Sequence, residues 1–295
     1  MLKRSPFHSF NSPVITVLTV LLLCLTHGFA QEIAPMQTTE QSPPNPLGLA
    51  QTPQQTFLHL GALLGLATQQ DAVHSPLRYT GAVVGFTGEL RAYSREIFVQ
   101  VATEAGFGLL TPNVGRERNL GAGISAIQTN TLSAVGFELL HREDHLTRLF
   151  AGPMLNVLLN IKVNTTFGNS ATAFDFYASL GAMARLEQDF TLFSKQWRGT
   201  SQVMLPLGGI AARPYYSTSL KVAASNSNTF ANFDTQGASI LTFPQILWRT
   251  SLDYTLSTGN WLSLTYAWDF YDYNRFNRVQ AARQALTLSL QVRLQ

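Results

Sequence analysis

The sequence is poor in cysteine, in charge and in long apolar segments. Its 295 residues contain one cysteine, Cys24, and only 13% charged side chains, about half the roughly 25% of an ordinary soluble domain. Because 20 basic residues are offset by 17 acidic ones, the large positive excess typical of a nucleic-acid-binding protein is missing. After residue 30, no segment approaches the roughly 20 apolar residues of a membrane helix. Yet 45% of the residues are hydrophobic, which excludes an intrinsically disordered chain.

The first 30 residues have the pattern of an export signal. Lys3 and Arg4 precede an apolar segment over residues 14–26, and Gly28 and Ala30 supply small residues at the cleavage site. We therefore predict a signal peptide over residues 1–30. Cys24 leaves with it, so disulfides, thiolate metal sites and cysteine catalysis are excluded for the mature chain. Its charge becomes (20 − 2) − 17 = +1. An uncleaved anchor and a lipoprotein modified at Cys24 fit less well, because the apolar segment is short and bulky leucines flank the cysteine.

Residues 31–54 are rich in proline and glutamine. Proline removes a backbone donor and fixes φ, so this composition favours an extended, solvated chain. We predict a disordered leader over residues 31–54, followed by one folded domain over residues 55–295.

From residue 55 onward, apolar residues recur with a period of two. The pattern is clearest over residues 248–256, 262–270 and 286–295, where for example Leu286, Leu288 and Leu290 alternate with Thr287 and Ser289. Successive side chains of a strand point to opposite faces, whereas a helix would repeat its apolar residues at intervals of three and four. Residues 97–107, 148–162 and 178–187 follow the same alternation. The sequence thus predicts an all-β protein whose strands have one apolar and one polar face.

The segments between these strands alternate in length. Nine links, long and short in turn, are expected near residues 70–77, 93–96, 111–119, 143–147, 164–172, 194–196, 214–242, 257–260 and 271–282. Nine links join ten strands, although eight or twelve strands also fit the pattern.

Together these features resemble bacterial outer-membrane β-barrel proteins as a broad class. The resemblance implies a closed antiparallel transmembrane β-barrel of about ten strands in the outer membrane, a periplasmic leader, and the lipid bilayer and the outer-membrane insertion machinery as partners. It also implies aromatic girdles, to which we assign Trp197 and Trp261 at one end and Trp268, Phe270 and Tyr271 at the other. One departure is the final Leu294-Gln295, because such chains commonly end with an aromatic residue.

The polar face supplies the candidate interior of the barrel. We predict a salt-bridged polar network there, since buried charges must be paired. Its expected members are Glu89, Glu104, Glu138, Arg185, Glu187, Arg249, Asp253, Asp269 and Arg293. Ten strands enclose little space once side chains are counted, so a wide porin is not expected.

Other candidate sites rest on fewer residues. His74, in the first predicted long loop between Asp71 and Ser75, is the catalytic candidate, although Ser75 points away from it on an extended chain. Arg116, Arg118, Arg275 and Arg278, with Arg283 beside the last loop, are candidates for contacts with lipopolysaccharide phosphates. The cluster from His141 to His145 is better explained as a charged turn than as a metal site. We expect no metal, cofactor or nucleotide, since no phosphate-binding glycine loop is present.

The first functional hypothesis is therefore a non-enzymatic outer-membrane barrel with a structural, adhesive or narrow-channel role. Two alternatives remain. One is a lipid hydrolase or acyltransferase acting at the outer leaflet. The other is a soluble secreted β-barrel, in which the apolar face would point inward.

Overall fold

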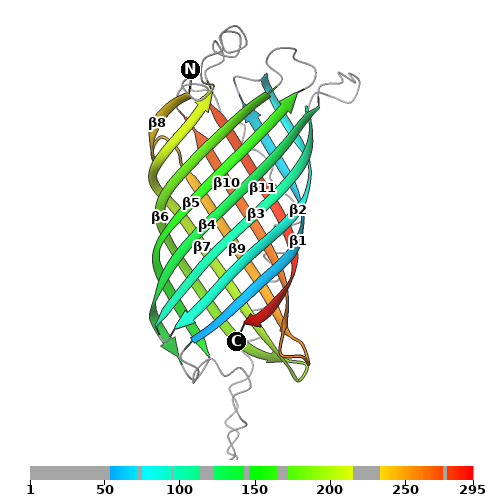
Figure 1. The fold of residues 1–295 in the computed structure, drawn as a ribbon, viewed down its shortest axis with the longest axis vertical. Coiled ribbons are helices and arrows are strands. Elements are labelled where there is room, and N and C mark those ends of the chain that lie inside the picture. Colours follow the sequence, from blue (N-terminus) through cyan, green and yellow to red (C-terminus); the bar gives the residue numbers. More distant parts are fainter. Residues whose placement is uncertain are drawn as a thin grey trace, which may run out of the picture. The chain divides into compact units, whose positions relative to one another are not determined.

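The computed structural model describes residues 54–71, 75–94, 96–112, 123–142, 146–164, 172–214, 233–274 and 278–294. These residues form eleven strands (Figure 1), with the following bounds: β1 (Gln54–Asp71), β2 (Ser75–Ser94), β3 (Ile97–Pro112), β4 (Ile124–Arg142), β5 (Thr147–Asn164), β6 (Thr172–Leu192), β7 (Lys195–Pro214), β8 (Phe233–Ser239), β9 (Gln245–Thr255), β10 (Trp261–Tyr273) and β11 (Val279–Leu294). Within the described residues there is no helix long and apolar enough to cross a membrane. The predicted signal peptide and almost all of the leader lie outside the described residues.

The strands form one closed antiparallel barrel. Each strand from β1 to β7 pairs with the next, β1 also pairs with β11, and β11 continues through β10 and β9 back to β7. The short β8 pairs with β7 at Gly208–Pro214, whereas β9 pairs with β7 at Trp197–Met204. Because β8 and β9 share one position, the eleven strands occupy ten positions, and the predicted ten-stranded barrel is confirmed.

The period of two separates the two faces of the wall. Leu264 and Leu288 are 49% and 55% exposed on the outer surface, whereas Asp269 is only 5% exposed. The outer surface carries leucine, valine and phenylalanine side chains, and the enclosed space, hereafter the lumen, holds the polar partners. This is the arrangement expected of a barrel in lipid and the reverse of a soluble barrel, in which leucines would fill the centre.

The links depart from the prediction in three places. The first was expected to be long, but the ladder runs up to an Asp71–Ser75 pair, which leaves only residues 72–74 between β1 and β2. The last link is also short, with residues 274–278 between β10 and β11. In the predicted loop over residues 214–242, Phe233–Ser239 forms β8. We call the end of the barrel with links 95–96, 143–146, 193–194 and 256–260 the turn end, and the opposite end the loop end.

Two of the predicted girdle aromatics lie in the lumen. Trp261 and Tyr271 are 6% and 4% exposed and share the inward face of β10 with Asp269. Both residues have odd numbers, as do most of the polar residues of this strand, so the alternation already indicated that they face the lumen. The girdle prediction was wrong for them because it considered only how close each residue lies to the end of the strand. Trp268 and Phe270 are on the outward face of the same strand, where their rings stack 6.3 Å apart.

Candidate functional site

The lumen contains the charged side chains of the barrel, arranged in layers. Toward the turn end, Arg185 on β6 donates from Nε to Glu187 Oε1 over 2.6 Å and from Nη1 to Gln202 Oε1 over 2.9 Å. Tyr93 on β2 donates to the same glutamate oxygen over 2.7 Å. Arg185 and Glu187 are 1% and 2% exposed, so the pair is desolvated and depends on these partners.

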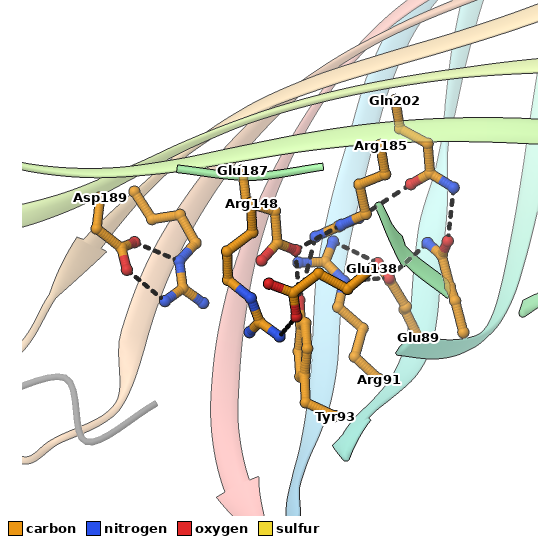
Figure 2. Close-up of polar contacts among 11 residues, drawn as sticks. Glu89, Arg91, Tyr93, Glu138, Arg148, Arg185, Glu187, Asp189 and Gln202 are labelled. Carbon is orange, nitrogen blue, oxygen red and sulfur yellow. Dashed lines mark hydrogen bonds and ion pairs between the residues drawn. The ribbon is translucent and has the colours of Figure 1, made fainter. Parts of the chain in front are cut away.

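The same network continues across the lumen through two glutamines (Figure 2). Gln202 on β7 donates to Gln100 Oε1 on β3 over 2.8 Å, and Gln100 donates in turn to Glu89 Oε1 over 2.6 Å. Arg91 completes the network with two bonds to Glu89, one of them from Nη2 to Oε2 over 2.9 Å. Each amide both accepts and donates, so the network spans the lumen without an unpaired charge.

Two further ion pairs lie closer to the turn end. Arg198 donates to both carboxylate oxygens of Asp189, over 2.5 and 2.9 Å. Arg148 donates to Glu138 over 2.7 Å, and His141 shares a second hydrogen bond of 2.7 Å with the same carboxylate. The bidentate Arg198–Asp189 geometry is the strong form of such a pair.

A second layer joins the wall around β3, β9, β10 and β11. Arg249 lies 3.2 Å from Glu104 and also bonds Asp269. Arg283 donates to Asp269 Oδ2 over 2.9 Å and also pairs with Glu104. Two guanidinium groups thus face two carboxylates, and each group has partners from two strands.

A third layer lies toward the loop end. Lys162 Nζ is 2.8 Å from Asp71 and 2.5 Å from Asp175. Arg213 bonds the same two carboxylates, over 2.9 and 2.7 Å. The four side chains therefore form a closed and electrically neutral ring, in which Lys162 is fully buried.

Beside this ring is an apolar cluster. Phe243 stacks on Tyr177 with ring centroids 4.4 Å apart and an interplanar angle of 17°, and Tyr271 and Tyr273 pack around both rings. Leu158, Ala211, Ala238 and Val279 complete the cluster.

Two small cavities lie between these groups. A cavity of about 60 Å³ lies among His59, Glu89, Gln100, Arg249 and the hydroxyl-bearing residues around them. A second cavity of about 30 Å³ adjoins Tyr271. Since one water molecule needs roughly 10–15 Å³ of cavity volume, each cavity has room for a few water molecules but not for a sizeable solute.

Eight of the nine predicted network residues lie on the inward face of the wall. They are Glu89, Glu104, Glu138, Arg185, Glu187, Arg249, Asp253 and Asp269. Asp253 is 0% exposed and accepts a hydrogen bond from Ser263. Arg293 is on the same side of β11 but is exposed at the strand end. The inward residues form separate layers rather than one continuous network.

The structure describes only some of the candidates that were predicted in or beside loops. Arg278 pairs with Asp272 over 2.7 Å at the loop end, and its side chain is 55% exposed. Arg283, predicted to lie beside a loop, is instead a lumen residue. His74, Arg116, Arg118 and Arg275 lie outside the described residues. In the described part of the chain, no three His, Cys, Asp or Glu side chains are grouped as metal ligands.

Sequence reasoning missed several partners of the network. The missed lumen charges are Asp71, Arg91, Arg148, Lys162, Asp175, Asp189, Arg198, Arg213 and Arg283. Most of them follow the period of two of their strands, so counting alternate positions up to the strand ends would have found them.

Comparison with known proteins gives similarity in fold only. No family model matches the sequence, and no curated protein matches it. Among solved structures, the outer membrane protease OmpT from Escherichia coli shares 10% identity with a TM-score of 0.45, over 82% of this chain and 98% of that one. The translocator domain of the autotransporter NalP from Neisseria meningitidis shares 9%, with a TM-score of 0.37, over 95% and 96%. The attachment invasion locus protein Ail of Yersinia pestis shares 7%, with a TM-score of 0.31, over 82% and 100%. At these identities and TM-scores, neither proteolysis nor attachment is assigned to this chain.

Proposed function

We propose that this protein is a non-enzymatic β-barrel of the bacterial outer membrane that is closed to ions and polar solutes. In this role it serves as a structural platform that holds the segments at its loop end on the outer surface of the cell. The observation that carries the proposal is the neutral ring of Asp71, Lys162, Asp175 and Arg213, with the Gln202–Gln100 bond below it. Opening the ring would leave buried charges without their partners, which costs several kcal/mol per ion. Separating the two glutamines would leave buried amide groups without hydrogen bonds, which also costs free energy.

The outer surface supports the membrane location. An unbroken series of exposed leucines on β11 faces outward, and closure of the sheet leaves no backbone edge to be satisfied by lipid. Export by the signal over residues 1–30, a periplasmic leader over 31–54 and insertion by the outer-membrane machinery complete the proposal. Lipopolysaccharide is the proposed partner of the loop end, where Arg278 is exposed.

Conductance in planar lipid bilayers tests the proposal. The folded protein, recognised by heat-dependent mobility on a denaturing gel, is added to a bilayer beside an established porin as a positive control. We expect no stable single-channel steps from this protein. Regular steps from the wild-type chain would overturn the closed barrel and favour the narrow-channel role.

A further inference from the structure

The barrel wall is interrupted between β7 and the position shared by β8 and β9. The β7–β9 ladder ends at the Met204–Leu247 pair, and the β7–β8 ladder begins at Gly208–Ser239. Between these pairs, β7 has three residues (208 − 204 − 1), whereas the facing chain has seven (247 − 239 − 1). Within the described ladders, Leu205 and Pro206 have no partner on this side, and proline has no N–H to donate. We call this interruption the seam.

The seam lies in the apolar part of the outer surface. On the β7 side, Leu207 and Ile210 are exposed, and Leu180 of the neighbouring β6 is exposed beside them. On the other side, Leu241 is 86% exposed, the joint highest value among the large hydrophobic side chains of the described chain. An apolar rim of this kind places the seam against lipid hydrocarbon.

An apolar compartment lies directly behind the seam. The extra residues between β8 and β9 send Phe243 inward, where it is 3% exposed and stacks on Tyr177. Tyr271, from the same cluster, also lines the cavity of about 30 Å³, whose wall combines small residues such as Ala281 and Gly108 with the polar side chains of Asn160, Asp269 and Arg283. The apolar part of this section is the cluster around Phe243 and Tyr177, and it lies behind a wall with a gap in its ladder pairing.

We propose that the seam is a lateral entrance for an uncharged hydrocarbon, such as one acyl chain or a small aromatic molecule, and that Phe243 closes it. When Phe243 leaves Tyr177, the ligand takes the place of the Phe243 ring against the tyrosine rings of the cluster. Opening at Leu205 and Pro206 breaks no ladder hydrogen bond on this side. The inference goes beyond the closed platform and does not depend on it, because a wall entrance from lipid can exist in a barrel that excludes ions.

The test uses an apolar photoreactive probe, 3-trifluoromethyl-3-phenyldiazirine, dissolved in vesicles that contain the full chain. After illumination, mass spectrometry measures labelling of Tyr177 and Tyr271 in the lumen. We expect both to be labelled in the wild type, and labelling to rise several-fold in Phe243→Ala. Absence of lumen labelling in both proteins would overturn the entrance.

A cross-link separates entry through the wall from entry at the loop end. In a Cys24→Ser background, Leu205→Cys and Ile246→Cys would be joined by oxidation or by a short bis-maleimide, since continuing the β7–β9 register places them opposite each other (205 + 246 = 204 + 247). The control joins Leu252→Cys to Leu264→Cys across the intact β9–β10 ladder. We expect the seam cross-link to reduce lumen labelling at least fivefold and the control to leave it unchanged. Labelling that is insensitive to the seam cross-link would overturn the lateral route, whatever the conductance experiment shows.

Discussion

Lys162 on β5 donates to Asp71 on β1 over 2.8 Å, although β2, β3 and β4 separate the two strands in the wall. The contact therefore crosses the lumen and joins parts of the barrel that share no ladder. Arg213 on β7 bonds the same aspartate, so three distant strands meet at one carboxylate.

Replacing Lys162 by methionine, which has a similar volume, should destabilise the barrel by about 3–5 kcal/mol, because the buried carboxylates of Asp71 and Asp175 lose their ammonium partner. Denaturant unfolding in detergent micelles measures the change. Lys195→Met is the matched control, since Lys195 is exposed at the turn end. This substitution should change the free energy of unfolding by no more than about 0.5 kcal/mol. Equal stabilities of the two variants would show that the ring contributes nothing.

Two glycines of β2 should respond in opposite ways to alanine. A Cβ at Gly81 would lie 1.8 Å from the carbonyl oxygen of Leu109, whereas at Gly88 its nearest neighbour would be Leu60 Cδ2 at 3.8 Å. Gly81→Ala must therefore push β3 away and should cost about 1–3 kcal/mol. Gly88→Ala should be tolerated, because its methyl group makes an ordinary contact. Thermal unfolding of both variants measures the two effects. An unchanged unfolding temperature in Gly81→Ala would contradict the close approach of β2 and β3.

The two faces of β10 give a fluorescence prediction. In single-tryptophan variants reconstituted with lipids that carry brominated acyl chains, Trp268 should be strongly quenched because it faces outward. Trp261 lies in the lumen with the guanidinium of Arg198 4.9 Å from its ring centroid, and should be quenched far less. Comparable quenching of both residues would place Trp261 at the lipid surface and restore the predicted girdle.

The period of two was enough to predict the barrel, the outward leucines and most of the lumen charges. It failed where a strand is irregular. On β7 the even-numbered residues face inward from Arg198 to Pro206, but Ala211 and Arg213 are also buried inward, because the register against β6 shifts between Leu180 and Gly181. Strict alternation counted from Arg198 would have predicted that Arg213 faces the lipid. A shift of one residue reverses every later side chain and has no reliable signature in a single sequence.

Which charged residues pair with each other could not be predicted from the sequence, for a different reason. Arg283 and Glu104 are 179 residues apart and meet only because the barrel closes. Phe243 was missed because it follows a segment predicted to be a loop, and its inward position depends on the extra residues between β8 and β9. Local patterns predict which face a residue occupies, but partners across a lumen depend on the register of every strand between them.

The most direct test of the account is the accessibility of spin labels along β11. Single cysteines are introduced in turn from residue 284 to residue 291, labelled with a nitroxide and reconstituted in lipid vesicles. Collision rates are then measured with oxygen, which concentrates in hydrocarbon, and with a water-soluble nickel complex. We predict strong oxygen collisions at Leu286, Leu288 and Leu290, and weak ones at Thr287 and Ser289, in strict alternation. High oxygen accessibility at Thr287 and Ser289, with Leu286, Leu288 and Leu290 shielded, would contradict a barrel that turns its leucines toward lipid.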